Sequence, residues 1–194
     1  MIFIRLLICK SKHATNMRKL DNSELPRLST EAFREQPKNP FVLVLDNVRS
    51  LHNVGSAFRT GDAFLIEKLY LCGITGTPPD REINKTALGA TESVAWEYAE
   101  DSLALVQSLR REGYQIVCIE QADQSVALQR FVPHKDKKYA FIFGNEVFGV
   151  KEEVVMMADA CVEIPQYGTK HSINVSVSLG IVCWDFLNKM ELTR

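Results

Sequence analysis

The sequence predicts an α/β protein with a mostly parallel β-sheet and helices on both faces of that sheet. Short apolar runs that are typical of strands alternate along the chain with segments whose apolar residues recur at helical spacing. The run at 139–143 is continuously apolar and rich in aromatic residues, as in a strand that is buried on both faces. The 194 residues, of which 46% are apolar and 24% charged, are enough for one well-packed domain.

Three parts are expected along the chain. Residues 1–16 are predicted to be a flexible extension, because their apolar start is too short to span a bilayer and lacks the basic segment and cleavage site of a signal peptide. Residues 17–40 are predicted to form an N-terminal arm with a short capped helix at 29–35. The domain proper is expected to cover residues 41–194, and no segment is expected to cross a membrane.

The domain proper is expected to begin with a strand at 41–46 and a helix at 53–65. Further strands are predicted at 68–72, 94–98, 115–119, 139–143 and 160–164. Further helices are predicted at 82–88, 101–111, 125–131 and 174–187. Strands that alternate with helices at this spacing favour parallel pairing.

Composition narrows the function classes. The five cysteines form no C-x-x-C pair and lie mostly in apolar runs, which indicates buried free thiols in a cytoplasmic protein and no zinc site. No group of residues has the spacing of metal ligands, so no metal is expected. The formal net charge of −1 means that any nucleic-acid partner must be held by a local basic patch.

Three polar, glycine-bearing segments follow apolar runs in the carboxy-terminal part of the chain. They lie at 143–146, 164–168 and 171–174. The first two begin where predicted strands end, and the third leads into the last predicted helix. Because the carboxyl ends of parallel strands meet at one edge of a sheet, we expect these segments to form one crevice.

A fourth polar segment, 47–60, follows the first predicted strand. Either Ser50 or Asn53 could cap the helix that begins there, and Gly55 would let a ligand or a second backbone approach its first turn. Arg59 lies among small residues, and an arginine in that setting usually has an anionic partner. The alternative is a capped helix with surface arginines.

The glycines of the segment 144–149 and the polar loop 165–174 also have plain structural interpretations, as a strand-to-helix turn and a capped helix start. A loop so long and so rich in hydrogen-bonding groups favours a binding role. The dinucleotide fingerprint G-x-G-x-x-G, the phosphate loop G-x-x-x-x-G-K-[ST] and the serine-hydrolase motif G-x-S-x-G are all absent.

Taken together, three motifs in this order resemble those of the SpoU (TrmH-type) RNA ribose 2′-O-methyltransferases of the SPOUT superfamily. They are N-x-G-x-x-x-R-T, F-G-N-E-x-x-G and I-P-x-x-G-x-x-x-S-[IL]-N-V-S-V, and the resemblance runs from residue 41 to 187. The resemblance implies transfer of a methyl group from S-adenosylmethionine to a ribose 2′-hydroxyl of RNA. It also implies a homodimer and a deep trefoil knot near the C-terminus, which general topology rules would exclude.

The resemblance also implies roles for particular residues. The cofactor pocket would be formed by main chain around five positions: Ile119, Glu120, Gly144, Ile164 and Ile173, the last in place of the more usual leucine. Arg59 would be the leading catalytic residue. The ribose, its phosphate or the partner subunit would be held by Asn53, Glu146, Ser172 and Asn174. Because a guanidinium keeps its proton in proteins, we expect a phosphate clamp that stabilises the developing alkoxide rather than a general base.

A structured RNA is the expected substrate, with transfer RNA slightly favoured over ribosomal RNA. Compared with many family members, the sequence has no separate substrate-binding domain and little after the last helix, so we expect RNA to dock on scattered cations. These are Arg18, Lys19, Arg27, Arg34, Lys38, Arg49, Arg81 and Lys170. The alternatives are a noncatalytic RNA-binding homodimer of the same fold and a dinucleotide-dependent oxidoreductase, against which the missing glycine fingerprint argues.

Overall fold

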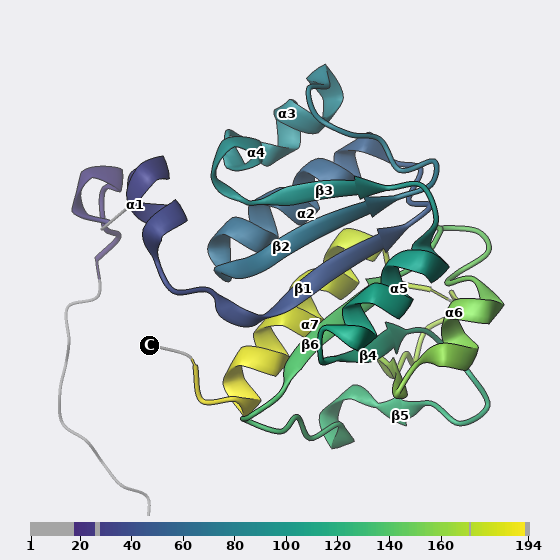
Figure 1. The fold of residues 1–194 in the computed structure, drawn as a ribbon. Coiled ribbons are helices and arrows are strands. Elements are labelled where there is room, and N and C mark those ends of the chain that lie inside the picture. The colour runs from purple at the N-terminus through teal and green to yellow at the C-terminus, as the bar shows by residue number, and fades with distance from the viewer. Residues whose placement is uncertain (1–17, 26–27, 171, 193–194) are drawn as a thin grey trace, which may run out of the picture.

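A computed structural model describes residues 18–25, 28–170 and 172–192. Within them the strands form one seven-stranded sheet in the order β3-β2-β1-β6-β4-β7-β5 (Figure 1). All neighbouring strands pair in parallel, which confirms the predicted parallel α/β class. The strands are β1 Asn39–Asp46, β2 Ile66–Cys72, β3 Trp96–Ala99, β4 Tyr114–Ile119, β5 Val126–Ala127, β6 Lys138–Phe143 and β7 Ala160–Glu163.

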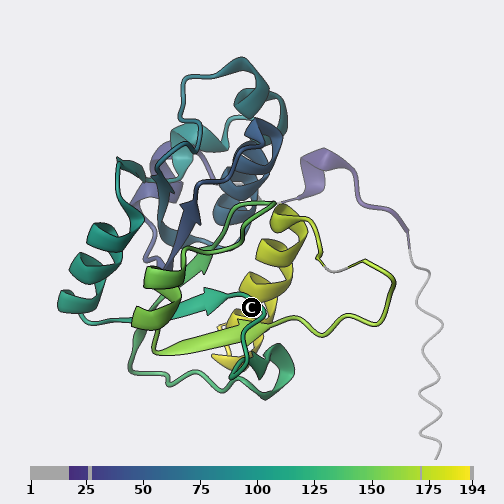
Figure 2. The same ribbon diagram turned by 90° about the vertical axis from the view of Figure 1, so that its right-hand side faces the viewer.

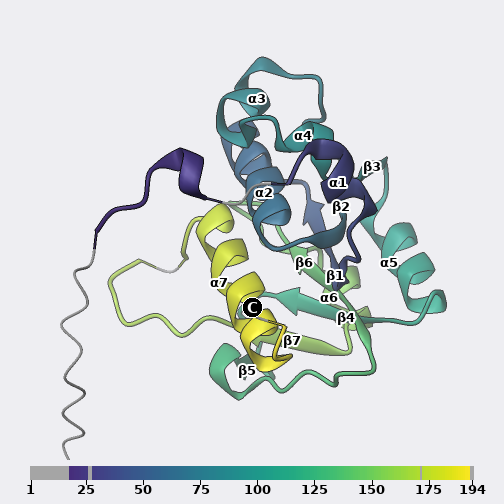
Figure 3. The same ribbon diagram turned by 90° about the vertical axis from the view of Figure 1, so that its left-hand side faces the viewer.

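Helices cover both faces of the sheet. They are α1 Thr30–Glu35, α2 Leu51–Ala63, α3 Arg81–Ala87, α4 Ala90–Ser93, α5 Ser102–Arg111, α6 Glu152–Met157 and α7 Val175–Lys189, with 3-10 segments at Asn22–Glu24 and Leu128–Arg130. Helices α5 and α6 lie on one face (Figure 2). On the opposite face α7 packs beside α2, with α3 and α4 beyond α2 (Figure 3). None of the described helices is long and apolar enough to cross a membrane.

The sheet divides the hydrophobic core into two layers. On β1, Phe41, Leu43 and Leu45 face the α2 and α7 side, whereas Val42 and Val44 face the α5 side. Phe186 of α7 contacts the rings of Phe41 and Phe141, with ring centroids 5.0 Å and 5.2 Å away. This aromatic cluster fixes α7 against the middle of the sheet.

The sequence left two candidates for the N-cap of helix α2. The Ser50 side chain accepts a hydrogen bond from the Asn53 main-chain NH, so Ser50 is the N-cap. Gly55 lies against α3, since a Cβ atom at this position would be 2.2 Å from the Ile83 carbonyl oxygen. The close approach at Gly55 is therefore that of a second backbone and not of a ligand.

Several elements differ from the sequence-based predictions. The predicted helix at 125–131 is wrong, because Val126 and Ala127 pair with β7 as a short edge strand and only a 3-10 turn follows. Helices α4 and α6 were not predicted; in α6 the buried Val154 is followed by a second β-branched residue, Val155, and this pair favours a strand locally. Strand β1 already begins at Asn39, inside the predicted arm. The predicted flexible extension, 1–16, lies outside the described residues.

Candidate active site

The predicted polar segments meet at the carboxyl edge of the sheet, where Glu146 connects two of them. Its Oε2 atom accepts a hydrogen bond from the Arg49 main-chain NH at 3.0 Å. Its Oε1 atom accepts from the Ser50 main-chain NH and from the Asn53 side-chain amide, both at 3.1 Å. A carboxylate from the loop after β6 therefore holds the N-terminal end of α2.

Asn174 connects the third segment to the same network. Its side-chain amide donates to Asn53 Oδ1 at 3.1 Å, and its own Oδ1 accepts from the Ser176 main-chain NH at 2.9 Å. Asn174 is thus both the N-cap of α7 and a partner of α2. One hydrogen-bonded chain, Glu146–Asn53–Asn174, runs through three segments that are far apart in the sequence.

The pKa of Glu146 is lowered relative to an ordinary glutamate. Burial alone would raise this pKa, but hydrogen bonds from the main chain at Arg49, Glu146 and Ser50 and from the Asn53 side chain outweigh that effect. The ionised carboxylate is therefore favoured in the folded chain. Because the folded-state pKa lies below the unfolded one, this stabilisation is present above the unfolded pKa and is lost as pH falls through the folded pKa.

Glu146→Gln should therefore lower stability most near neutral pH. We expect the difference in free energy of unfolding between wild type and this variant to narrow as pH falls from about 7 to about 3, since the wild-type carboxylate is then protonated. Urea unfolding at a series of pH values measures this difference. A difference that stays constant over the whole range would show that the charge of Glu146 does not stabilise the α2 terminus.

A cavity of about 560 Å³ lies beside this network, and its size suits a small organic cofactor. All five residues predicted to form the cofactor pocket line it: Ile119, Glu120, Gly144, Ile164 and Ile173. Three predicted catalytic residues, Glu146, Ser172 and Asn174, line it as well. The walls come from the ends of β4, β6 and β7 and from the start of α7, as expected for the carboxyl edge of a parallel sheet.

The turn after β6 forms one wall of the cavity and leaves no space for side chains inside it. Asn145 and Gly149 exchange main-chain hydrogen bonds at 3.0 Å and 2.9 Å. A Cβ atom on Gly144 would lie 2.1 Å from the main chain of Gly149 and Val150, closer than such atoms approach. Gly144 is required because two stretches of backbone pass each other here.

The Glu120 side chain has a structural role that was not predicted from the sequence. Its carboxylate accepts hydrogen bonds from the main-chain NH groups of Gln121 at 2.9 Å and Val150 at 2.9 Å. The carboxylate therefore ties the end of β4 to the turn after β6. Glu120 and its neighbours Ile119 and Gln121 line the cavity.

Arg59 does not line the cavity of the single chain. The helix places Arg59 about 9 Å beyond Asn53 and about 120° around the axis, so only Asn53 reaches Glu146. Arg59 is exposed, on the same stripe of α2 as His52 and Ser56. No side chain among the described residues pairs with its guanidinium.

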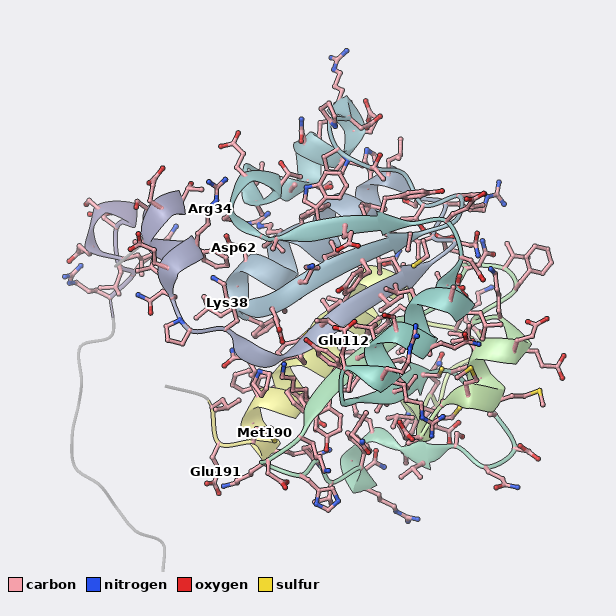
Figure 4. The ribbon with its side chains drawn as sticks, in the orientation of Figure 1. Arg34, Lys38, Asp62, Glu112, Met190 and Glu191 are labelled. Carbon is pink, nitrogen blue, oxygen red and sulfur yellow. The ribbon has the colours of Figure 1, made fainter. Side chains whose placement is uncertain are left out.

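The cations predicted to dock RNA fall into two groups. Arg18 forms a bidentate pair with Glu24 at 2.8 Å and 2.5 Å, which lowers the pKa of that carboxyl to about 2. The side chains of Arg34 and Lys38 donate to the carbonyl oxygens of Glu92 and Phe33, on the side of the arm that faces the domain (Figure 4). The exposed cations whose side chains have no partner among the described residues include Lys19, Arg49, Arg81 and Lys170. Arg27 lies outside the described residues.

Asn145 is a structural residue of the site whose importance the sequence analysis missed. Its Oδ1 accepts from the main-chain NH groups of Val147 and Phe148, and its amide donates to the Asn47 carbonyl oxygen at 2.7 Å. The available signal was an asparagine followed by two residues that its own side chain could bond, a common turn-forming pattern.

The described residues contain no group of histidine, cysteine and acidic side chains that could hold a metal. The thiols of Cys72, Cys118, Cys161 and Cys183 are free, and burial raises the pKa of Cys72 to about 12. The cavity itself is lined largely by loop residues at the carboxyl ends of parallel strands. The fold and this cavity are those of a parallel α/β protein with a candidate ligand site at the carboxyl ends of its strands.

Comparison with known proteins identifies the family. The sequence profile of the SpoU rRNA methylase family matches residues 40–184, and the chain belongs to that family. The chain is 32% identical, over 161 residues, to a tRNA (guanosine(18)-2′-O)-methyltransferase of Aquifex aeolicus, covering 81% of this chain and 73% of that protein. It is 29% identical to the 23S rRNA (guanosine-2′-O-)-methyltransferase RlmB of Neisseria meningitidis, covering 74% of this chain and 56% of that protein.

Solved structures agree with this assignment. An S-adenosylmethionine-bound rRNA methyltransferase from Sinorhizobium meliloti superposes with a TM-score of 0.75 at 26% identity, over 84% of this chain and 61% of that chain. The TrmH/SpoU tRNA-modifying enzyme of A. aeolicus gives a TM-score of 0.73 at 28% identity, over 84% of this chain and 81% of that chain. The prediction of family and of the parallel α/β class is confirmed.

Proposed function

We propose that this chain transfers the methyl group of S-adenosylmethionine to a ribose 2′-hydroxyl of a structured RNA, with transfer RNA favoured over ribosomal RNA. Membership of a methylase family with named RNA 2′-O-methyltransferases supports the activity and the cofactor. Transfer RNA is favoured because the chain covers a larger share of the Aquifex tRNA methyltransferase than of the Neisseria rRNA methyltransferase. A dinucleotide-dependent oxidoreductase is not supported by any of these similarities.

The observation that carries the proposal is the cavity beside Gly144 and its connection to Asn53 through Glu146 and Asn174. The cavity volume of about 560 Å³ fits a cofactor of the size of S-adenosylmethionine. Main chain at the strand ends can recognise an adenine and a ribose, and the closed turn at Gly144 forms one wall of the cavity. These residues fit the proposed cofactor.

The reaction is an in-line displacement, in which the cofactor supplies an electrophilic methyl group. The protein must align the ribose hydroxyl and stabilise its oxygen as the proton leaves. We assign the alignment to Asn53, Glu146, Ser172 and Asn174. Arg59 is assigned to the phosphate next to the target ribose, where a fixed cation would also stabilise a developing alkoxide.

The C-terminal deep trefoil knot remains part of this proposal. Its support is the path of the chain: the segment after β7 passes the cavity and returns as α7 beneath β1 and β6, where Phe186 is buried. Near its end, α7 also contacts the connection between β5 and β6, through the Lys189 side chain and the Leu128 carbonyl oxygen. A threaded tail of this kind would hold the loop 165–174 over the cofactor.

A homodimer is proposed because α7 carries an unpaired apolar stripe. Val177, Ile181 and Trp184 lie on one side of the helix and are 50%, 37% and 57% exposed. Nothing lies within 4 Å of a Cβ atom built on Gly180, in the same region, so a second backbone could approach there. Since α7 packs beside α2, a partner seated on this stripe would also lie near the exposed Arg59 stripe.

Trp184→Asp should therefore turn a dimer into a monomer, because a buried unpaired carboxylate is costly at an apolar interface. Sedimentation equilibrium measures the change in mass. Met156→Asp is the matched control, because Met156 is 80% exposed on α6, on the other face of the sheet, and should not affect assembly. A wild-type chain that is monomeric at all concentrations tested would contradict the proposed dimer.

The activity itself is tested by transfer of a labelled methyl group from S-adenosylmethionine to total cellular RNA, followed by mapping. We expect label in one or a few nucleotides, and resistance of the adjacent phosphodiester bond to alkaline cleavage, because the 2′-oxygen is blocked. Label on a base, or none in any RNA fraction, would contradict a ribose methyltransferase. No labelling combined with RNA binding would instead favour the noncatalytic dimer.

A further inference from the structure

A second cavity, of about 730 Å³, lies next to the first. Asn145, Phe148 and Gly149 line both cavities, so the turn after β6 is the wall between them. The remaining lining residues come from the loops after β1 and β2 and from the start of α6: Asn47, Arg49, Ile74, Val150, Lys151, Glu152 and Glu153. Only the turn after β6 would separate a ligand in this second cavity from the proposed cofactor.

Phe148 is the most unusual residue of this wall. Its side chain is 86% exposed, although exposing an aromatic ring to water is unfavourable. The turn that carries it is not loose, because Asn145 Oδ1 accepts the main-chain NH groups of Val147 at 2.8 Å and Phe148 at 3.1 Å. Asn145 is in turn held by the Asn47 carbonyl oxygen. The ring is therefore presented to solvent by a fixed backbone.

The charges around the second cavity suit one phosphate and not several. Arg49 lines the cavity and its side chain has no partner among the described residues, whereas Lys151 lies 3.7 Å from Asp101. Glu152 and Glu153 line the same space and would repel a run of phosphates. A ligand that fits this arrangement has one flat ring system and one negative charge near Arg49.

We propose that the second cavity receives a single unstacked RNA nucleotide, whose base stacks on Phe148 and whose phosphate pairs with Arg49. This deepens the proposed function, on which it rests, by assigning a site for the substrate nucleotide. Proteins read single-stranded RNA by stacking splayed bases on aromatic side chains, and the shared wall places such a base next to the methyl donor. Phe148 is thus a substrate-positioning residue.

The test uses a short single-stranded RNA that contains the fluorescent base 2-aminopurine, bound to the full chain. Fluorescence is expected to be quenched on binding to wild type and to Phe148→Trp, because both present an aromatic face. Phe148→Ala and Phe148→Leu are expected to bind this RNA about tenfold more weakly and without quenching. Met156→Ala, a second exposed apolar residue that lines neither cavity, is the matched control and should behave as wild type.

Arg49→Ala provides an independent readout. Only its side chain is removed, so the main-chain hydrogen bond to Glu146 is retained. Loss of one phosphate contact should reduce the slope of log affinity against log salt by about 0.7 for a single strand. An unchanged slope, or full quenching by Phe148→Leu, would overturn the proposal; binding of an apolar peptide in place of RNA would overturn it as well.

Failure of the nucleotide site can be distinguished from failure of the proposed methyl transfer. Quenching and the salt slope are equilibrium measurements that need no methyl donor. A chain that quenches the RNA probe but transfers no methyl group would contradict the proposed activity and still support the nucleotide site. Methyl transfer with a KM for RNA that is equal in wild type and Phe148→Ala would support the activity and contradict the site.

Discussion

Arg59→Ala is expected to lower kcat for methyl transfer by about 10²- to 10³-fold, with little change in affinity for S-adenosylmethionine. The side chain is exposed on α2, lines no part of the proposed cofactor cavity and has no partner among the described residues. Its proposed partner is the RNA phosphate beside the target ribose, which is present only in the substrate complex. Removing the Arg59 side chain should therefore raise the free energy of the transition state for methyl transfer and leave the affinity for the cofactor unchanged.

Two further variants test the nature of this role. Arg59→Lys keeps the cation but loses the planar fork, so turnover near that of wild type would argue against bidentate phosphate binding. Arg111→Ala is the matched control, because Arg111 is also exposed but lies at the end of α5, on the opposite face of the sheet. Wild-type kcat for Arg59→Ala would contradict the assignment of Arg59 as a catalytic residue.

Gly144→Ala should abolish measurable cofactor binding or weaken it at least about tenfold. The added Cβ atom would lie 2.1 Å from the main chain of Gly149 and Val150, and backbone cannot swing away as a side chain can. The turn must open, which would displace the wall of the cavity and break the exchange of hydrogen bonds between Asn145 and Gly149. Calorimetric titration with S-adenosylhomocysteine measures the loss of affinity.

Gly168→Ala is the control for this effect. No atom lies within 4 Å of a Cβ atom at Gly168, so this change should leave the Tm close to that of wild type. Circular dichroism before each titration shows whether Gly144→Ala is folded. A folded Gly144→Ala variant that binds the cofactor as wild type does would contradict the assignment of this turn to the cofactor wall.

The sheet could be predicted from the sequence because burial leaves a local signal. Strands such as β1 and β6 are buried on both faces and read as continuous apolar runs. The edge strand β5 has only two residues, and its pairing with β7 is a tertiary contact that no local pattern encodes. Helix α6 was missed for a related reason, since its Val154 and Val155 favour strand locally and only packing against the sheet decides the outcome.

The parts of the candidate site that lie at the ends of strands were predictable from the sequence. Parallel strands end at the same edge, so the meeting of Glu146 with the segment that carries Asn53 followed from the fold class. The position of Arg59 did not follow, because it depends on the rotation of α2 about its axis relative to the cavity. The hydrogen bond between the Glu120 carboxylate and the Val150 main chain did not follow from the fold class either, since residues 30 positions apart give no periodic signal.

The cavity beside Gly144 is the proposed site for the methyl donor. Calorimetric titration of the wild-type chain with S-adenosylmethionine tests it most directly, because binding requires neither RNA nor turnover. We expect one site per chain, with competition by S-adenosylhomocysteine and no heat from NADH. No binding at millimolar S-adenosylmethionine, by a chain that is folded, would contradict a methyl-donor site in this cavity.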